Sequence, residues 1–331
     1  MNITLNENVN QITSGTYSVN ANVQNNITNE KADNSVEHVA AILELSDTVM
    51  QEGKVTVKSV QNENMACSQT EDFSTLAMEE TVSPMAMGTT QIQECQNWLR
   101  TLGLYSGSPD GNAGGTELVK GVKAFQRVYG LTINGTINTT TYNKIKTVCN
   151  FYSEIYSSEA MKTLEKSLYL DEHAKKNFAH VWTFLKCGMS LTNAQIAGVM
   201  GNIHKESAFS SDNAENTKGY PGKHDTGLYE YALTDKIGYG LLQWTDYNRK
   251  LGLYNMADTM KRDISDIFVQ LAYFREEING DYADTWAAIK NTYIYSDVSD
   301  IFLREFESPR NPNYEERRET AKIIYDEIKE M

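Results

Sequence analysis

The sequence predicts a mainly α-helical protein with two folded domains behind an N-terminal segment that has little capacity to fold. Three observations support this fold class. Apolar residues recur at helical spacing over residues 160–331, two Asx-Gly turn signals separate helical segments within residues 89–150, and the composition changes near residue 88. We therefore expect a small three-helix domain at 89–150 and a larger α-rich domain at 160–331.

Residues 1–88 form the segment with the fewest core-forming side chains. They contain no tryptophan, Tyr17 and Phe73 are their only aromatic residues, and they hold 12 acidic residues against 3 lysines. Such a chain buries too little apolar surface to offset the entropy lost on folding. We expect it to be largely disordered, and the sequence leaves open whether it is a flexible tail or a docking segment.

The balance of charge excludes some classes of partner. The 331-residue chain has a formal net charge of −14. An acidic protein gains no general electrostatic steering toward nucleic acids or anionic membranes, so we expect neither nucleic-acid binding nor membrane insertion. The N-terminus lacks the basic and apolar regions of a secretory signal, which predicts a protein made in the cytoplasm.

Residues 89–150 predict a compact three-helix unit. Its small apolar core is expected to contain Trp98, Leu99, Val122 and Phe125. An Asp-Gly pair at Asp110-Gly111 and an Asn-Gly pair at Asn134-Gly135 favour tight turns between the helices, because glycine adopts positive φ without strain.

This pattern is similar to the small three-helix peptidoglycan-binding domain. The similarity is carried by Gln96, Leu99, Gly103, Gly107, Asp110, Gly111, Thr116, Phe125, Gln126, Leu131, Asn134, Gly135, Thr141 and Tyr142. The chain departs from the family pattern at Asn134, where aspartate is usual, and by one extra residue between Gly111 and Phe125. The resemblance implies a module that binds the cell wall, with the candidate residues Asp110, Gly111, Phe125 and Gln126. The alternative is a generic three-helix module whose glycine and Asx residues serve only the turns.

A helix-forming segment in the larger domain brings a carboxylate onto an apolar face. Thr192 and Gln195 form a capping-box signal at its start. The apolar stripe that follows consists of Ile196, Val199, Met200 and Ile203, and Glu206 falls on the same stripe. Desolvation and the negative end of the helix dipole both favour a protonated carboxyl, which a general acid requires. Taken alone, the helix equally permits a solvated or paired surface glutamate.

A glycine-rich segment follows in the sequence. Gly238-Tyr239-Gly240 permits close backbone approach, while Gln243 and Trp244 provide an amide and an aromatic plane. Such groups bind sugar rings through hydrogen bonds to N-acetyl groups and stacking on C–H faces. The combination of this segment with Glu206 favours a carbohydrate-binding cleft.

Together these segments resemble the phage tail lysozyme family, a branch of the lysozyme-like fold that also includes soluble lytic transglycosylases. The motifs are GNIHKES at 201–207, GYGLLQWT at 238–245, and Phe306-Glu307-Ser308-Pro309 followed by Arg317-Arg318. The resemblance implies that Glu206 is the catalytic acid. The substrate would be the glycan strand of peptidoglycan, cut at the β-1,4 bond between N-acetylmuramic acid and N-acetylglucosamine. The implied substrate-binding residues are Ser207, Tyr239, Gly240, Gln243 and Trp244. For the closing motif we expect a structural role, in which its arginines cap a helix or form salt bridges.

A glycosidase usually needs a second carboxylate as base or nucleophile. Asp212, Glu215 and Asp225 lie between the two motifs, and we favour Asp225 as a catalytic residue because the surrounding residues predict a turn that can re-aim its side chain. Without such a carboxylate, the substrate's own C6 hydroxyl would attack and leave an anhydro sugar, as in lytic transglycosylases. A non-catalytic wall-binding or particle-assembly protein is the alternative from another functional class.

Metal and cofactor chemistry is not indicated. A zinc amidase needs two or three histidines and a carboxylate around the metal. The five histidines are His38, His173, His180, His204 and His224, and none of them forms a metal-binding pair. We therefore expect no metal and no cofactor.

Cysteine usage and the missing signal bear on how the protein is made. Cys95 and Cys149 fall on the first and last helices of the small module and can approach each other, but production in the cytosol favours free thiols. A wall hydrolase without a signal is typical of a phage or prophage lysis enzyme that a separate pore-forming protein releases. Delivery on a phage tail or injection particle fits equally well.

Overall fold

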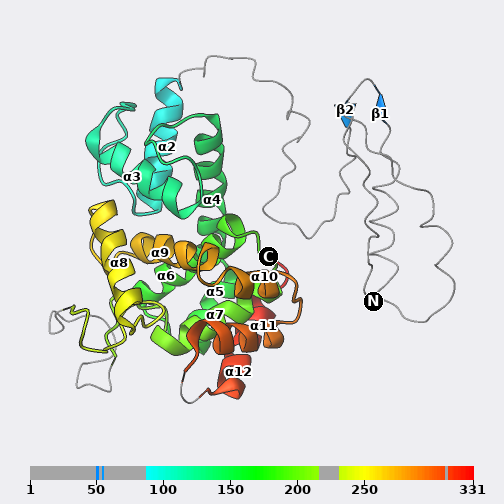
Figure 1. Cartoon of the computed structure of the whole chain (residues 1–331). Coiled ribbons are helices and arrows are strands. Elements are labelled where there is room, and N and C mark those ends of the chain that lie inside the picture. The colour runs from blue at the N-terminus through cyan, green and yellow to red at the C-terminus, as the bar shows by residue number, and fades with distance from the viewer. Residues whose placement is uncertain (1–49, 52–53, 56–86, 216–230, 310–311) are drawn as a thin grey trace. The chain divides into compact units, whose positions relative to one another are not determined.

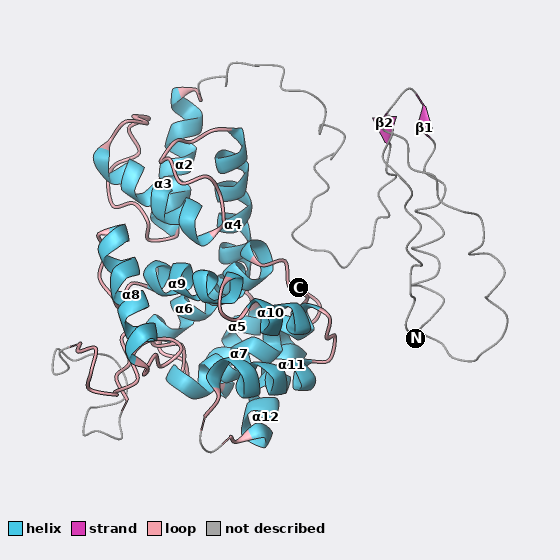
Figure 2. Ribbon diagram, in the orientation of Figure 1, coloured by secondary structure: helices cyan, strands magenta, loops and turns pink. Residues whose placement is uncertain are grey.

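A computed structural model of the chain describes residues 50–51, 54–55, 87–215, 231–309 and 312–331. Helices dominate these residues, so the predicted mainly α fold is confirmed (Figure 1; Figure 2). Strands β1 (Met50–Gln51) and β2 (Lys54–Val55) pair antiparallel. The rest of the N-terminal segment, for which the sequence predicts little order, lies outside the described residues.

The small module consists of the helices α2 (Thr89–Thr101), α3 (Thr116–Val128) and α4 (Thr139–Ser157). Its predicted core is confirmed, because Leu99, Val122 and Phe125 have no exposed surface. Half-buried Trp98 packs edge-on against Tyr142, with their ring centroids 5.2 Å apart. Helix α4 continues past residue 150, and Ser158 then caps α5 (Glu159–Ser167), so one helix follows the other without an intervening loop.

A buried glutamine anchors the first Asx-Gly turn of this module. Gln96 Nε2 donates to Asp110 Oδ1 at 2.6 Å, and Gln96 Oε1 accepts from the Gly111 backbone N–H at 2.8 Å. The left-handed φ of +76° at Gly111 explains the glycine.

The second turn repeats this arrangement. Gln126 Nε2 donates to Asn134 Oδ1 at 3.0 Å, and Gln126 Oε1 accepts from Gly135 N–H at 2.8 Å. The amide oxygen of Asn134 accepts hydrogen bonds here as a carboxylate oxygen would. The departure from the family pattern at this position therefore leaves the turn intact.

The larger domain is built around α7 (Asn193–Ser207), which contacts α6, α11 and α12. Its other elements are α6 (Glu172–Thr183), the π-helical segment η3 (Phe184–Gly188), α8 (Tyr247–Met260), α9 (Ile267–Asn279), α10 (Ala283–Lys290), α11 (Tyr295–Ile301), the π-helical segment η5 (Phe302–Glu307) and α12 (Tyr314–Ile328). The predicted capping box of Thr192 and Gln195 is confirmed, and all four residues of the predicted apolar stripe have no exposed surface.

Two glycines on α7 allow neighbouring helices to approach its backbone. A Cβ atom at Gly201 would lie 2.8 Å from both the Ala321 nitrogen and the Arg317 carbonyl oxygen of α12. A Cβ atom at Gly198 would lie 2.6 Å from the Tyr295 carbonyl oxygen of α11. Real side chains do not tolerate such distances, so these glycines determine how closely α11 and α12 pack.

The small module packs against the larger domain where α3 contacts α9 and α4 contacts α6 and η3. Lys144 Nζ donates to the Cys187 carbonyl oxygen at 2.6 Å, and Arg275 Nη1 donates to the Gly188 carbonyl oxygen at 3.1 Å. The Arg275 guanidinium also lies against Gly130, where a Cβ atom would be 2.2 Å from Nη2.

The described cysteines are buried. They are Cys95, Cys149 and Cys187. Burial, followed by the nearby Glu94 carboxylate, raises the pKa of the Cys95 thiol to about 12. Cys95 and Cys149 are free thiols, as expected, whereas Cys67 lies outside the described residues. Within the described part of the chain, no helix has the length and hydropathy to cross a membrane.

We expect Gly201→Ala to destabilise the protein. Alanine inside a helix is normally favoured over glycine by about 1 kcal/mol, but here its methyl group would collide with the backbone of α12. Overpacking of this kind costs about 1–3 kcal/mol, so the free energy of unfolding in denaturant should fall. Gly114→Ala is the control, since a Cβ atom there meets nothing closer than 3.5 Å. A Gly201→Ala variant as stable as the wild type would contradict the close packing.

Candidate functional site

Glu206 occupies the last turn of α7 and is paired with an arginine. Arg317 Nη2, from α12, donates to Glu206 Oε1 at 2.6 Å. The two side chains are only 11% and 18% exposed for Arg317 and Glu206, so the ion pair is largely shielded from water. The sequence predicts that the Glu206 carboxyl is partly withdrawn from solvent, and its small exposed fraction agrees with this expectation. The sequence, however, did not identify Arg317 as its specific partner.

The asparagine of the first motif holds Arg317 in place. Asn202 is fully buried, and its Nδ2 donates to the Gly198 and Ser299 carbonyl oxygens at 3.0 and 3.1 Å. Arg317 Nη1 in turn donates to the Asn202 Oδ1 atom at 3.2 Å. The Gly-Asn-x-x-x-Glu spacing therefore places a support for the arginine one turn before the glutamate.

The second motif forms a tight loop. Tyr239 and Trp244 exchange two backbone hydrogen bonds, at 3.3 and 3.0 Å. Between them, Gly240 and Gln243 both have left-handed backbone conformations, with φ of +77° and +47°. The strained conformation at Gln243 is held by its own side chain, because Nε2 donates to the Gly240 and Asn213 carbonyl oxygens at 2.9 and 3.1 Å.

A buried glutamine of α9, which sequence reasoning missed, fixes this loop to the core. Gln270 Oε1 accepts from the Leu241 N–H at 2.8 Å, and Nε2 donates to the Ser211 carbonyl oxygen at 2.6 Å. A Cβ atom at Gly240 would lie 2.7 Å from Gln270 Nε2, which gives this glycine a structural reason. No motif marks Gln270, since a single polar residue in an apolar helix has many possible roles.

Ser207 joins the two motifs. Its hydroxyl is buried and donates to the Leu241 carbonyl oxygen at 2.9 Å. The glycine-rich loop is therefore tied to the residue next to Glu206. The next two residues, Ala208 and Phe209, both have positive φ, at 52° and 62°. Non-glycine residues adopt this conformation only when the surroundings enforce it.

The residues expected to touch sugar are largely inside the protein. Trp244 has no exposed surface, Tyr239 is 2% exposed, and Trp244 Nε1 donates to Glu277 Oε2 at 2.9 Å. A sugar ring stacked on the Trp244 plane does not fit this burial. The Tyr239, Trp244 and Ser207 side chains and the backbone of Gly240 instead shape and support the loop.

A cluster of charged groups surrounds this end of α7. Arg249 of α8 forms a bidentate pair with Glu277 of α9, with distances of 2.6 and 3.2 Å, and its guanidinium lies 4.7 Å from the Phe306 ring centroid. Glu307, at the end of η5, interacts electrostatically with Glu206, Arg249, Arg317 and Glu277. The Phe-Glu pair of the closing motif thus belongs to the site.

Glu307 is the unusual member of this cluster. Its Oε1 atom is buried and has no hydrogen-bond partner, and the same holds for Arg317 Nε. Burial, followed by repulsion from Glu206, raises the pKa of Glu307 well above its usual range, while Arg249 and Arg317 act in the opposite direction. A carboxyl oxygen that is buried without a partner is unusual in folded proteins and makes Glu307 a candidate for a functional role.

The candidates for a second carboxylate have different surroundings. Asp225, the favoured one, lies outside the described residues. Asp212 Oδ1 accepts from Ser210 Oγ at 2.8 Å and lies 3.5 Å from His173 Nε2. Glu215 Oε2 accepts from the Gly238 N–H at 3.1 Å, so it supports the glycine-rich loop.

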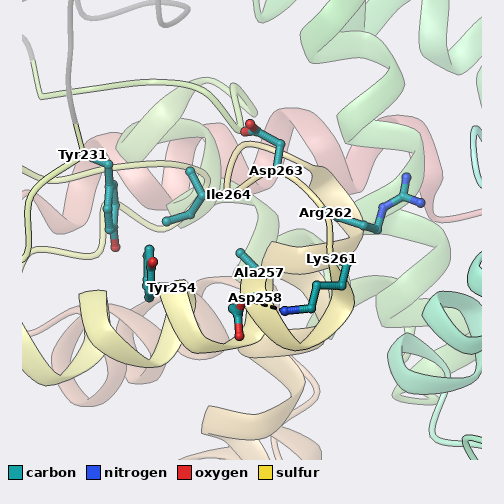
Figure 3. Close-up of a pocket in the computed structure, with 8 residues that line it drawn as sticks. All are labelled: Tyr231, Tyr254, Ala257, Asp258, Lys261, Arg262, Asp263 and Ile264. Carbon is teal, nitrogen blue, oxygen red and sulfur yellow. Dashed lines mark hydrogen bonds and ion pairs between the residues drawn. The ribbon is translucent and has the colours of Figure 1, made fainter.

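A hollow of about 330 Å³ lies beside the C-terminal end of α8 (Figure 3). Its lining residues are Tyr231, Tyr254, Ala257, Asp258, Lys261, Arg262, Asp263 and Ile264. Lys261 Nζ pairs with Asp258 at 2.7 Å, and Arg262 pairs with Asp266 at 2.7 Å. Since its cations are already paired, the hollow offers no chemistry comparable to that around Glu206.

The described residues contain no group of three or more His, Cys, Asp or Glu side chains arranged to hold a metal ion. His180 is buried, and desolvation lowers its pKa to about 3, so its ring is neutral. Its ring stacks on Tyr152 at a centroid distance of 4.5 Å, which is a packing role.

In the small module, the four candidate wall-binding residues divide into two kinds. Phe125 and Gln126 are 0% and 1% exposed, so they form the core and the second turn. Asp110 is exposed, and hydrogen bonds from the Asn112 N–H and Gln96 lower the pKa of its carboxyl. Gly111 is partly exposed beside it, so the first turn is the accessible part of this set.

We expect Ser207→Ala to destabilise the protein by about 1–3 kcal/mol, because the Leu241 carbonyl would lose its buried donor. Urea unfolding monitored by circular dichroism would measure this change. The control is Ser157→Ala, whose exposed hydroxyl bonds within its own helix and whose loss should change stability by less than about 0.5 kcal/mol. Equal effects of the two substitutions would show that the Ser207 bond does not hold the loop.

We expect Glu307→Gln to flatten the dependence of stability on pH. A carboxyl with a raised folded-state pKa stabilises the fold fully below its unfolded pKa, and that stability is lost as the pH rises through the folded pKa. The loss is about 1.4 kcal/mol for each pH unit over which only the unfolded state has released the proton. Glutamine cannot ionise, so above the ordinary pKa of a glutamate carboxyl the unfolding free energy of the variant should rise relative to that of the wild type as the pH increases. Parallel curves for the two proteins would contradict a protonated Glu307.

Two parts of the chain match known families. Residues 176–328 match the family described as phage tail lysozyme, and residues 89–145 match a peptidoglycan binding domain. No curated protein and no solved structure matches the chain. The two matches support a cell-wall hydrolase or lytic function in general, and binding to peptidoglycan. The chain is therefore similar to the phage tail lysozyme family over residues 176–328 and, before them, to a peptidoglycan binding domain over residues 89–145.

Proposed function

We propose that the protein hydrolyses the glycan strand of peptidoglycan at the β-1,4 bond between N-acetylmuramic acid and N-acetylglucosamine, with Glu206 as the general acid. The observation that carries the proposal is the position of Glu206. It ends the central helix of the matched lysozyme domain, it is partly shielded from solvent, and the adjacent Ser207 binds the loop of the second motif.

The chemistry needs one proton and one water molecule. Glu206 donates its proton to the bridging oxygen as the glycosidic C–O bond breaks. Water supplies the hydroxyl group to the anomeric carbon, and the second proton of that water restores the acid. Arg317 fixes the direction of the Glu206 carboxyl through Nη2, while the Asn202 oxygen fixes Arg317.

The arrangement of domains supports the same substrate. A module that holds the wall next to a domain that cuts it raises the effective substrate concentration without adding catalytic contacts. The module packs against α9, the helix whose Gln270 anchors the loop of the second motif. Wall binding therefore takes place on the same rigid scaffold that positions the site. Because the chain is acidic, attachment to an anionic wall relies on this stereospecific contact rather than on general charge.

We expect Glu206→Gln to lose at least about 100-fold in the rate of peptidoglycan digestion, since general acids contribute about 10²–10⁴-fold. Purified peptidoglycan would be digested by each protein, and the released fragments reduced and analysed by mass spectrometry. New reducing muramic acid ends that depend on Glu206 would establish a muramidase.

Glu159→Gln is the matched control, because Glu159 is 87% exposed and pairs only with Lys162 on the surface of α5. Anhydro ends in place of reducing ends would assign the same acid to a lytic transglycosylase. Wall binding without any turnover by the wild type would identify a non-catalytic protein, and activity that survives Glu206→Gln would exclude this residue as the acid.

A further inference from the structure

The hollow beside the C-terminal end of α8 is lined by an exposed aromatic side chain. Tyr254 is 54% exposed and faces the hollow (Figure 3). Among the described residues, its side chain makes no hydrogen bond and no ring contact. A single exposed aromatic residue is ordinary on a protein surface, but one that lines a hollow offers its ring to a ligand.

A second tyrosine lines the same hollow and is held in place by the protein. Figure 3 shows Tyr231 on the same side of the hollow as Tyr254. The Tyr231 hydroxyl donates to the Lys250 carbonyl oxygen at 2.8 Å, and Lys250 Nζ lies 4.8 Å from the Tyr231 ring centroid. The Tyr231 ring also packs edge-on against Tyr239, at a centroid distance of 5.2 Å. The hollow therefore has one fixed and one exposed aromatic ring, and it adjoins the loop of the second motif.

The rest of the lining is charged, without a surplus of cations. Lys261 pairs with Asp258 at 2.7 Å, and Arg262 pairs with Asp266 at 2.7 Å. Asp263 adds a third carboxylate to these two cations. An anionic ligand would therefore meet more negative than positive charge, so the lining disfavours it.

The size and the chemistry of the hollow suit an uncharged sugar ring. Its volume of about 330 Å³ lies at the small end of the range for ligand pockets, about 300–1,000 Å³, which suits one ring rather than a long segment. Aromatic faces stack on the C–H faces of sugars, and carboxylate oxygens accept hydrogen bonds from sugar hydroxyl groups. In the peptidoglycan strand, N-acetylglucosamine is the uncharged sugar, whereas N-acetylmuramic acid carries a lactyl carboxyl group.

We propose that this hollow is a further glycan-binding site, which holds an N-acetylglucosamine residue against Tyr254 and Tyr231. The choice of peptidoglycan as the polymer rests on the proposed function.

The hollow lies at the opposite end of α8 from the charged cluster around Glu206. Arg249, in the first turn of α8, belongs to that cluster, whereas Lys261 follows the last turn. At 1.5 Å per residue, these two residues are about 18 Å apart along the helix axis. The hollow therefore binds a part of the strand away from the bond that is cut, and its occupancy does not require the acid.

The test is a titration of the full-chain Glu206→Gln protein with the N-acetylglucosamine tetramer, which this variant should leave uncut. Tyrosine rings labelled with carbon-13 report binding by NMR, and the Tyr254 signal is identified by its absence from Tyr254→Phe. We expect this signal to shift and to saturate. The signal of Tyr293, which is 67% exposed and does not line the hollow, should stay in place. A Tyr254 signal that does not move would overturn the proposal.

Removal of the exposed ring tests whether it makes the contact. In Tyr254→Ala, half-saturation of the Tyr231 signal should need at least about fivefold more ligand, as expected for the loss of a central aromatic contact. Tyr254→Phe keeps the ring and should retain most of the affinity. Tyr293→Ala is the matched control, because it removes an exposed tyrosine outside the hollow. Tyr254→Ala with undiminished affinity would contradict the proposal.

The charge of the lining is tested with a pair of monosaccharides. N-acetylglucosamine and N-acetylmuramic acid differ by the lactyl carboxyl group. We expect N-acetylglucosamine to bind more tightly at the Tyr254 signal, because the lining has no surplus cation for a carboxylate. Equal or tighter binding of N-acetylmuramic acid would show that the hollow does not select the uncharged sugar.

This proposal and the proposed function fail in different ways. If Glu206→Gln still digests peptidoglycan, the acid assignment is wrong, whether or not the Tyr254 signal shifts. If Glu206→Gln is inactive and the Tyr254 signal does not move, only the further glycan site is wrong.

Discussion

The close contact of α12 with α7 is the constraint on which the site depends. Gly201 lets the α12 backbone approach to a distance that any side chain would prevent. That approach brings Arg317 within hydrogen-bond reach of Glu206 and of Asn202. The residues of the first motif therefore act together. Gly201 lets α12 approach, Asn202 orients Arg317, and Glu206 accepts a hydrogen bond from that arginine. Ser207 holds the neighbouring loop.

The second motif depends on buried polar groups rather than on apolar packing. Its loop is closed by left-handed residues and held by Ser207 and Gln270, both of which bond to the backbone of Leu241. Buried backbone groups must find partners, so these two side chains fix the position of the loop as well as its shape. The same requirement applies to Trp244: because its indole is buried, Nε1 needs the acceptor that Glu277 provides.

The small module uses the same principle. A buried glutamine bonds both the Asx side chain and the glycine N–H at each of its two turns. The turns are thus fixed from inside the core, which leaves the Asp110-Gly111 turn available at the surface. Packing of this module on η3 and α9 joins it to the scaffold that carries Glu206.

The sequence by itself determined the helical fold, the capping box at Thr192, the apolar stripe of α7 and the core of the small module. These features follow from periodicity and local turn chemistry, which depend only on neighbouring residues. The sequence also singled out Glu206 and the loop as candidates. Only the tertiary structure decided that Arg317 pairs with Glu206, that Trp244 is buried, and that Glu307 joins the charged cluster. These contacts join helices far apart in the chain, and burial and charge pairing arise only when those helices pack, so no local pattern encodes them.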